Sequence, residues 1–288
     1  MDGAVRSNAF PRGAESADGK GRSAVGRPAV SEKAPTGDAP RSGILLRTEG
    51  LTKHFGSLVA VGGIDLEVRQ GELRAIIGPN GAGKSTFFDL ITGRVRVTKG
   101  QVFFKGEEIT GLRPHEIVRR GLGRAFQLSR TFPSLTVVEN IQAAIQARRR
   151  HQNPFRDIAA LEDTWIHAEK IAVDIGLEAK ADVRSSELSH GDQRLLEIGI
   201  TLGTEPELLL LDEPTAGLSP GETEATVERV RKLAATRTIL LVEHDMRVVM
   251  SLAMTITVFH QGQVIATGAP SEVVEDEQVR RVYLTRGA

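Results

Sequence analysis

The stretch that decides the fold of this chain reads Gly78-Pro79-Asn80-Gly81-Ala82-Gly83-Lys84-Ser85-Thr86. It follows a short apolar segment, Arg74 to Ile77, and it precedes a segment of helical character, Phe87 to Thr92. Strand, glycine-rich loop and helix in this order are the context that the phosphate-binding pattern G-x-x-x-x-G-K-S requires. The sequence therefore predicts an α/β fold in which a nucleotide phosphate lies at the end of a strand.

The residue types of this loop suit a polyphosphate. Glycines lack Cβ, so successive backbone N–H groups can converge on one phosphate, and the following helix presents the positive end of its dipole to the same anion. Lys84 adds a point charge for the β- and γ-phosphates, and the hydroxyl of Ser85 is a ligand for Mg²⁺. The alternative is a glycine turn that caps a helix and binds nothing. The complete pattern in its strand-to-helix context favours the phosphate site.

A second candidate element is the apolar run Leu208 to Leu211, which ends in Asp212, Glu213 and Pro214. Carboxylates buried at a strand end are unfavourable unless a cation meets them, and Mg²⁺ bound to ATP is such a cation. We expect Asp212 to hold the metal, directly or through water, and Glu213 to act as the general base on the attacking water. Considered alone, the same residues could be two surface acids that open a turn at Pro214.

A third element is Leu188-Ser189-His190-Gly191-Asp192-Gln193, which precedes an apolar run compatible with a helix. Ser189 and Gly191 at the start of that helix form a further potential anion site. By itself this segment predicts only a helix N-cap. Its position about twenty residues before the acidic strand end gives it more weight.

Composition excludes several classes of protein. The chain has 288 residues, with 37 Lys+Arg against 37 Asp+Glu, so its net charge of +0 argues against a nucleic-acid binder held by bulk charge. A cysteine count of 0 excludes disulfides, thiolate metal sites and a cysteine nucleophile. Runs such as Leu208 to Leu211 are far shorter than the roughly 18 apolar residues of a membrane span. We therefore expect a chain that does not cross a bilayer by itself.

Local composition divides the chain into two regions. Residues 1–42 are dominated by Ala, Gly, Ser and Pro and are predicted to be a disordered tail, with a cleaved targeting peptide as the alternative. Residues 43–288 are predicted to form the folded domain. Alternation of Ile64, Leu66 and Val68 with charged residues predicts an antiparallel strand, and apolar spacing predicts a helical insert at about 129–190.

The last third of the chain returns to alternating strands and helices. Expected there are a helix over 221–234, strands over 238–242 and 252–259, a hairpin into 264–266 and a terminal helix around 271–283.

In their order these segments resemble the ATP-binding subunit of an ABC transporter, over about Leu45 to Leu284. The matching parts are a candidate adenine-stacking aromatic at Phe55, the Walker A loop at Gly78 to Thr86, the Q-loop glutamine Gln127, the signature at Leu188 to Asp192, the Walker B strand that ends at Asp212 and Glu213, and the switch histidine His244. The resemblance implies a P-loop NTPase core with an antiparallel β subdomain and a helical subdomain, which binds ATP and Mg²⁺. It implies that Glu213 and His244 are catalytic and that Gln127 joins Ser85 and Asp212 around the metal.

The sequence departs from the family pattern at three places. The signature has His190 and Asp192 where the family usually has glycine and glutamine, Ser219 stands where aspartate is common, and Phe55 stands where tyrosine is common. Phenylalanine keeps the stacking face and lacks the hydroxyl.

The resemblance also implies partners. Two ATPase chains associate head to tail, so that ATP lies between the Walker A loop of one and Ser189 and Gly191 of the other. The second chain is an identical copy or a paralogous ATPase subunit. Two transmembrane permease subunits complete the transporter, with a periplasmic solute-binding protein if it is an importer. The chain is then a peripheral subunit at the cytoplasmic face of the inner membrane, and no nucleic acid is expected.

Finer motifs favour one kind of transporter. The segments Gly123 to Gln127, Leu135 to Asn140, Glu243 to Met246 and Val282 to Leu284 together resemble importers of branched-chain amino acids. Importers of urea and short amides are the alternative, and lipopolysaccharide-export ATPases come third. Soluble ABC ATPases without a transporter usually carry long coiled-coil inserts or two cassettes, and this sequence has one phosphate-binding loop.

Overall fold

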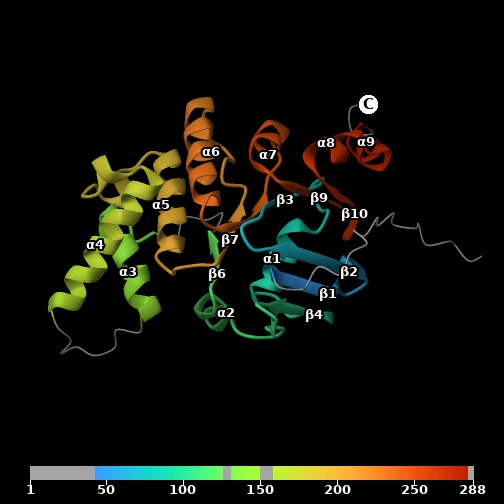
Figure 1. The fold of residues 1–288 in the computed structure, drawn as a ribbon, viewed down its shortest axis with the longest axis horizontal. Coiled ribbons are helices and arrows are strands. Elements are labelled where there is room, and N and C mark those ends of the chain that lie inside the picture. The colour runs from blue at the N-terminus through green and yellow to red at the C-terminus, as the bar shows by residue number, and fades with distance from the viewer. Residues whose placement is uncertain (1–42, 126–130, 150–157, 285–288) are drawn as a thin grey trace, which may run out of the picture. The chain divides into compact units, whose positions relative to one another are not determined.

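Two β-sheets form the scaffold of the computed structural model, which describes residues 43–125, 131–149 and 158–284 (Figure 1). The first sheet is antiparallel and has the strand order β2-β1-β4-β5. Its strands are β1 (Ile44–Phe55), β2 (Leu58–Arg69), β4 (Lys99–Phe104) and β5 (Glu107–Glu108). The predicted tail, 1–42, lies outside the described residues.

The second sheet has the order β10-β9-β3-β8-β7-β6, in which only β10 runs antiparallel to its neighbour. Its strands are β3 (Leu73–Ile77), β6 (Leu122–Ala125), β7 (Leu208–Asp212), β8 (Thr238–Val242), β9 (Thr255–His260) and β10 (Gln263–Gly268). Every residue of β7 and β8 is buried, as expected of parallel strands that are covered on both faces. The α/β fold with an antiparallel β subdomain is thus confirmed.

The described part of the chain also forms helices, some of which cover this sheet (Figure 1). They are α1 (Lys84–Ile91), α2 (Pro114–Arg120), α3 (Val137–Arg149), α4 (Ile158–Ile175), α5 (His190–Leu202), α6 (Pro220–Ala234), α7 (Met246–Leu252), α8 (Pro270–Glu275) and α9 (Glu277–Leu284), with short 3-10 turns at Glu178–Lys180 and Ser185–Glu187. Helix α1 shares one hydrophobic core with both sheets, in which Phe87 and Phe88 are fully buried. The ring of Phe87 meets that of Phe259 edge to face at 5.3 Å. The helix after the phosphate loop is therefore fixed by packing on both sides.

Helices α3, α4 and α5 pack together as a helical group (Figure 1). Val137, Ile141 and Ile145 share the buried face of α3, as their spacing predicts. On α4 the apolar spacing predicts the buried face less well, because Leu161 is 50% exposed.

The structure corrects two expectations in the last third of the chain. The strand predicted over 252–259 begins only at Thr255, because Asp245 caps a helix that continues to Leu252. The single terminal helix is two helices, since the carboxylate of Asp276 accepts hydrogen bonds from the N–H groups of Gln278 and Val279 at 2.7 and 3.1 Å and so starts a new helix.

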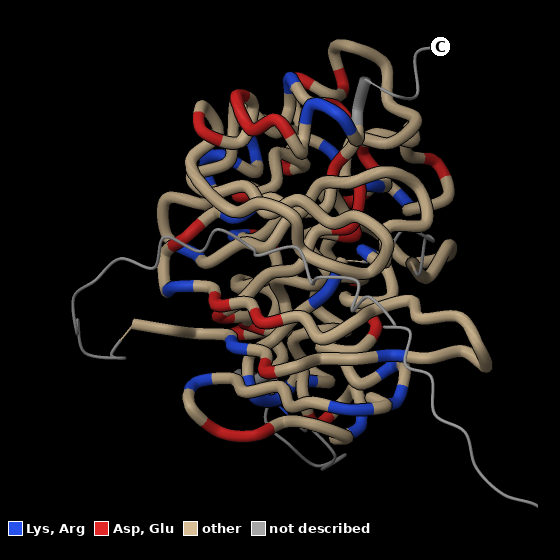
Figure 2. The backbone as a smooth tube through the Cα atoms, turned by 90° about the vertical axis from the view of Figure 1, so that its right-hand side faces the viewer, with Lys and Arg blue, Asp and Glu red and all other residues tan. Residues whose placement is uncertain are grey.

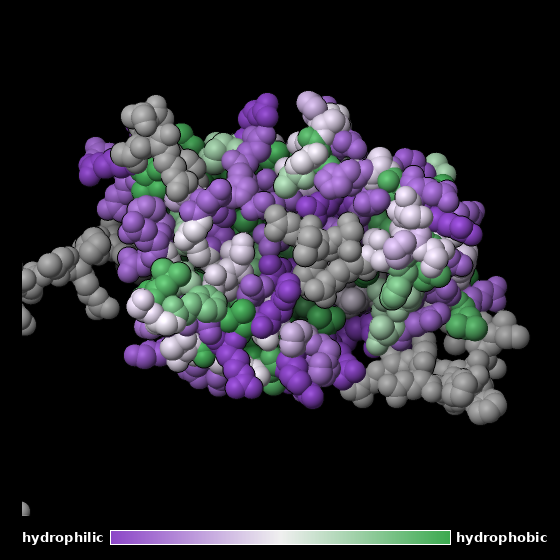
Figure 3. All heavy atoms as spheres, turned by 180° about the vertical axis from the view of Figure 1, so that it is seen from behind, coloured by the Kyte–Doolittle hydropathy of each residue, from purple (hydrophilic) through white to green (hydrophobic). Residues whose placement is uncertain are grey.

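Charged residues of both signs are interspersed along the backbone (Figure 2). On the face seen in Figure 3, apolar side chains form small groups among polar ones. Within the described ranges no helix combines the length and the apolar character needed to cross a membrane.

Candidate nucleotide-binding and hydrolytic site

The phosphate loop leaves β3 at the carboxyl end of the parallel strands and leads directly into α1. Two of its glycines are required by close backbone approach. A Cβ on Gly78, where φ is +152°, would lie 2.2 Å from the carbonyl oxygen of Phe259, and one on Gly83, where φ is +101°, would lie 2.4 Å from that of Ala60. The turn after β9 braces the loop, because Gly262 N–H donates to the carbonyl of Ala82 at 3.0 Å.

The loop is prepared for an anion. Gly83 caps α1 without a side-chain hydrogen bond, and the first turn of α1 contains no acidic residue. The ammonium group of Lys84 is buried and donates to the carbonyl oxygens of Gly78 and Pro79 at 2.7 and 3.1 Å. Ser85 is exposed beside it. The positive charge of Lys84 thus lies inside the loop, next to the N-terminal, positive end of α1.

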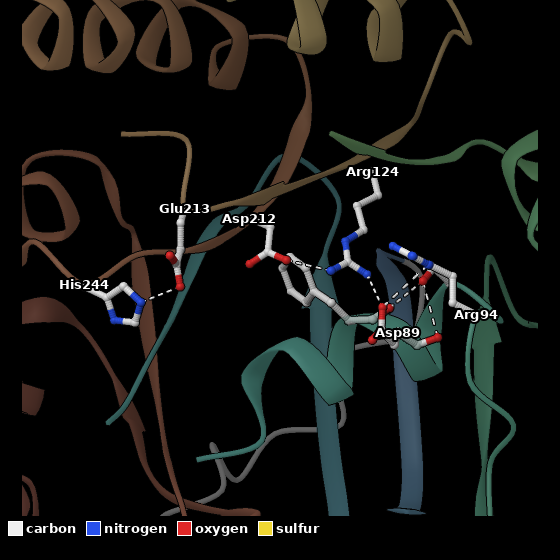
Figure 4. Close-up of polar contacts among 8 residues, drawn as sticks. Asp89, Arg94, Arg124, Asp212, Glu213 and His244 are labelled. Carbon is white, nitrogen blue, oxygen red and sulfur yellow. Dashed lines mark hydrogen bonds and ion pairs between the residues drawn. The ribbon is translucent and has the colours of Figure 1, made fainter. Parts of the chain in front are cut away.

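Asp212 ends β7 and is paired with an arginine that motif reasoning did not assign to the site. The guanidinium of Arg124, on β6, donates to Asp212 Oδ2 at 2.6 Å and to Asp89 Oδ1, on α1, at 2.7 Å (Figure 4). The side chains of Arg124 and Asp212 are only 8% and 4% exposed. Arg94 lies on the other side of Asp89, with 3.9 Å between Nε and Oδ1. The bridge joins the Walker B strand to the helix that carries Lys84.

The oxygen donors at this edge suit Mg²⁺. The hydroxyl of Ser85 follows β3 and the carboxylate of Asp212 ends β7, and only β8 separates these two strands in the sheet. Hydroxyl and carboxylate oxygens, completed by phosphate oxygens, are the ligands that Mg²⁺ takes in nucleotide sites. Gln127, the third expected ligand, lies outside the described residues.

Glu213 and His244 come together. The Nε2–H of His244 donates to Oε1 of Glu213 in a short hydrogen bond (Figure 4). The backbone of Glu213 is left-handed, with φ of +52°, and its N–H donates to the carbonyl of Val242 at 2.9 Å. A non-glycine residue in this region is strained by about 1–3 kcal/mol, which is typical of functional sites. The structure thus places the imidazole of His244 against the carboxylate of Glu213, the candidate general base.

The signature segment lies on another part of the fold. Ser189 is the N-cap of α5; its hydroxyl accepts from Asp192 N–H at 3.2 Å and donates to Oδ2 of Asp192 at 2.9 Å. Asp192, one of the two departures from the family signature, also forms an ion pair with Lys180. Gly191 N–H donates to Oε1 of Glu222, on α6, at 3.2 Å.

Glu222 is held by several donors. Its Oε2 accepts from the hydroxyl and the N–H of Ser219 at 2.7 and 3.0 Å. The hydrogen bond from the Ser219 hydroxyl, then those from the backbone of Ser219 and of Gly191, lower the pKa of Glu222. The carboxylate of Glu222 thus accepts a hydrogen bond from Gly191 N–H, the group that the sequence predicts to contact an anion.

Phe55 is 49% exposed at the end of β1, with Lys53 Nζ 4.9 Å from its ring centroid. An exposed aromatic face is what a stacking contact with adenine requires. Sequence reasoning missed Arg124, Asp89 and Glu222 as site residues, because each acts through a contact between elements that are distant in the chain.

The chain matches the family model of the ABC transporter over residues 61–216 and that of the branched-chain amino acid ATP-binding cassette transporter over residues 263–284. The high-affinity branched-chain amino acid transport ATP-binding protein LivG of Salmonella typhimurium is 40% identical over 257 residues, which are 83% of this chain and 97% of that protein. BraF of Pseudomonas aeruginosa, described in the same words, is 39% identical over 252 residues, with coverage of 83% and 97%.

A crystal structure of a nucleotide-free ATP-binding cassette from an ABC transporter has a TM-score of 0.73 at 32% identity and covers 83% of this chain and 98% of its own. That of the ADP conformation of an ATP-binding cassette has a TM-score of 0.73 at 31% identity, with coverage of 84% and 98%. The resemblance seen in the motifs is confirmed, including the resemblance to branched-chain amino acid transporters. The chain therefore belongs to the ABC transporter family, as an ATP-binding and ATP-hydrolysing subunit grouped with the branched-chain amino acid transport ATP-binding proteins.

Proposed function

We propose that this chain hydrolyses ATP to power the uptake of branched-chain amino acids through partner membrane subunits. One observation carries the proposal: identity of 38–40% over nearly the whole length of relatives named as high-affinity branched-chain amino acid transport ATP-binding proteins. The match of residues 263–284 to the branched-chain model, which lies outside the ABC transporter match, supports it independently.

Each site residue receives a role in hydrolysis. Residues 78–86 enclose the phosphates, Lys84 neutralises the β- and γ-phosphates, and Phe55 stacks on adenine. Mg²⁺, when held by Ser85, Asp212 and Gln127, offsets phosphate charge. Glu213 takes the proton of the attacking water, and His244, which donates to Glu213 Oε1, orients that carboxylate.

The fold supports a dimer of ATPase chains. Within the described part of the chain, α5 packs against α3, α4, α6, β6 and β7, none of which carries the phosphate loop. In the proposed dimer, Ser189 and Gly191 contact a nucleotide that is held by the phosphate loop of a second chain, either an identical copy or a paralogue. ATP then lies between the two chains, and hydrolysis removes the γ-phosphate that links them. The carboxylate of Glu222 gives up the N–H of Gly191 when the partner's γ-phosphate arrives.

The remaining partners follow from the transport role. We expect two transmembrane permease subunits and a periplasmic solute-binding protein, with this chain peripheral at the cytoplasmic face of the inner membrane. Fractionation tests that location: the chain should be recovered with membranes and be released without detergent.

Uptake of labelled leucine and labelled urea in cells deleted for this chain tests the function. Wild type should restore leucine uptake and Glu213→Gln should not. Loss of urea uptake alone would transfer the chain to the urea importers. If neither uptake changes and no paralogue substitutes, the proposal is wrong.

A further inference from the structure

Glu243 is a buried carboxylate beside Glu213 and His244, and the proposed hydrolysis assigns it no role. It follows β8 directly and is 3% exposed. Its Oε1 accepts hydrogen bonds from the N–H and the hydroxyl of Thr215, at 3.0 and 2.6 Å, and its Oε2 accepts one from the N–H of His244, at 3.0 Å. Three donors therefore converge on one carboxylate that is shielded from water.

These bonds join the exits of two neighbouring strands. Thr215 lies two residues after Glu213 in the turn that leaves β7, and His244 is the second residue after β8. The strands are in parallel register up to the pair Asp212 and Val242. Glu243 thus links the turn that contains Glu213 to the backbone of His244, whose side chain contacts Glu213.

The conformation of Glu213 makes this tie necessary. A left-handed non-glycine residue persists only where the surrounding structure holds it in place. The N–H of Glu213 donates to the carbonyl of Val242 at 2.9 Å, and its carbonyl accepts from Ala216 N–H at 3.1 Å. Within the turn that this second bond closes, Thr215 is anchored to Glu243 through both its N–H and its hydroxyl. If the anchor of Thr215 on Glu243 is released, the turn can relax and carry the side chain of Glu213 away from His244.

We propose that Glu243 is a positioning residue of the hydrolytic centre, whose carboxylate holds the Thr215 turn against the backbone of His244 and so keeps Glu213 and His244 in contact. This inference rests on the proposed catalytic roles of Glu213 and His244. Glu243 itself touches neither the nucleotide-binding residues nor the carboxylate of Glu213 among the described hydrogen bonds.

The substitution Glu243→Gln removes the charge with little change of shape. A carboxamide has one accepting oxygen, so in either orientation its NH₂ group faces the donors of Thr215 or the N–H of His244. We expect kcat for ATP hydrolysis by the full chain to fall by about tenfold or more, because even a small displacement of the reacting groups strongly lowers the rate of the chemical step. The KM for ATP should stay within about twofold, since the phosphate loop is untouched.

Two controls separate positioning from folding. Glu72→Gln alters another buried glutamate, 8% exposed, which accepts from Arg69 N–H and from Arg74 at the opposite end of the sheet. Thr238→Val removes a buried hydroxyl that accepts from Gly71 N–H at 2.9 Å at the start of β8, the strand that leads to Glu243. Both should lower the unfolding midpoint and leave kcat unchanged.

Variants of Thr215 test the contact from its other side. Thr215→Val should lower kcat in the manner of Glu243→Gln, and Thr215→Ser, which keeps the hydroxyl, should retain it. The double variant Thr215→Val with Glu243→Gln should be no slower than the slower single variant, because both changes break one contact.

Several results would overturn the inference. One is a normal kcat in Glu243→Gln while Glu213→Gln is inactive, which would leave the base assignment intact and remove only the positioning role. Another is a loss of kcat in Glu72→Gln equal to that in Glu243→Gln, which would make the effect one of stability. Normal turnover by Glu213→Gln would instead overturn the base assignment, and with it the reason to position that residue.

Discussion

Replacement of Arg124 by methionine isolates the role of the buried bridge between β6, β7 and α1. Methionine keeps much of the length and apolar volume of the arginine stem and removes the guanidinium. Asp212, which is 5% exposed, then loses the partner that lies 2.6 Å from its Oδ2, and Asp89 loses one at 2.7 Å. A carboxylate is left at the strand end without its counter-ion.

The magnitude follows from the burial of this pair. Removal of one partner of a buried ion pair typically destabilises a protein by about 3–5 kcal/mol, because the remaining charge stays out of water. For a domain of this size each kcal/mol shifts the unfolding midpoint by roughly 2–4 °C, so we expect a decrease of about 6–20 °C without nucleotide. If Mg²⁺ binds Asp212 as proposed, it supplies a new counter-charge there, so Mg²⁺ with ADP should make this deficit smaller.

Thermal unfolding of the full chain with and without Mg²⁺ and ADP measures both effects. Arg74→Met is the matched control, because Arg74 pairs with Glu72 at 2.9 Å and its side chain is 12% exposed, at the opposite end of the sheet. Its deficit should be the same with and without Mg²⁺ and ADP. The reasoning is refuted if Arg124→Met is as stable as wild type, or if Mg²⁺ and ADP reduce its deficit no more than that of Arg74→Met.

Three further predictions concern the nucleotide and the signature. Glu213→Gln should bind ATP normally, abolish turnover and accumulate an ATP-bound dimer in size-exclusion chromatography; substantial turnover would show that Glu213 is not the base. Lys84→Ala should raise the Kd for ATP by about 10- to 150-fold, from the loss of about 1.5–3 kcal/mol in a charge-assisted contact, and an unchanged Kd in a nucleotide fluorescence titration would contradict the loop assignment. The hydrogen bonds from Ser219 and Gly191 lower the pKa of Glu222. The ionised carboxylate therefore contributes its full stabilisation above the ordinary pKa of 4.5, and this contribution is lost as the pH falls from 4.5 through the lower pKa of the folded state. Denaturant unfolding of Glu222→Gln should therefore show a constant deficit from neutral pH to 4.5 that closes below it; a deficit that closes above 4.5 would show that the carboxylate is not held this way.

Local patterns in the sequence were sufficient to predict the candidate phosphate-binding loop and its strand-to-helix context. The strand, the glycines and Lys84 are consecutive, so their geometry is fixed by backbone preferences that the sequence displays directly. Asp212 and Glu213 were identifiable for a similar reason, because an acidic pair after an apolar run is unusual unless a cation or donors meet it. The boundary errors fell where side-chain caps decide, at Asp245 and Asp276, since capping depends on a few hydrogen bonds and leaves little trace in periodicity.

The order of the strands in the sheet decided the rest. Because β7 and β8 are neighbours in parallel register, Glu213 meets His244 and Thr215 meets Glu243, although 28 residues separate Thr215 from Glu243 in the chain. Arg124 reaches Asp212 for the same reason, because β6 pairs with β7. The sequence alone identified the candidate groups for binding a nucleotide and for hydrolysing it. Only the tertiary structure determined which of those groups touch, because contacts between strands depend on sheet order and register, and spacing along the chain encodes neither.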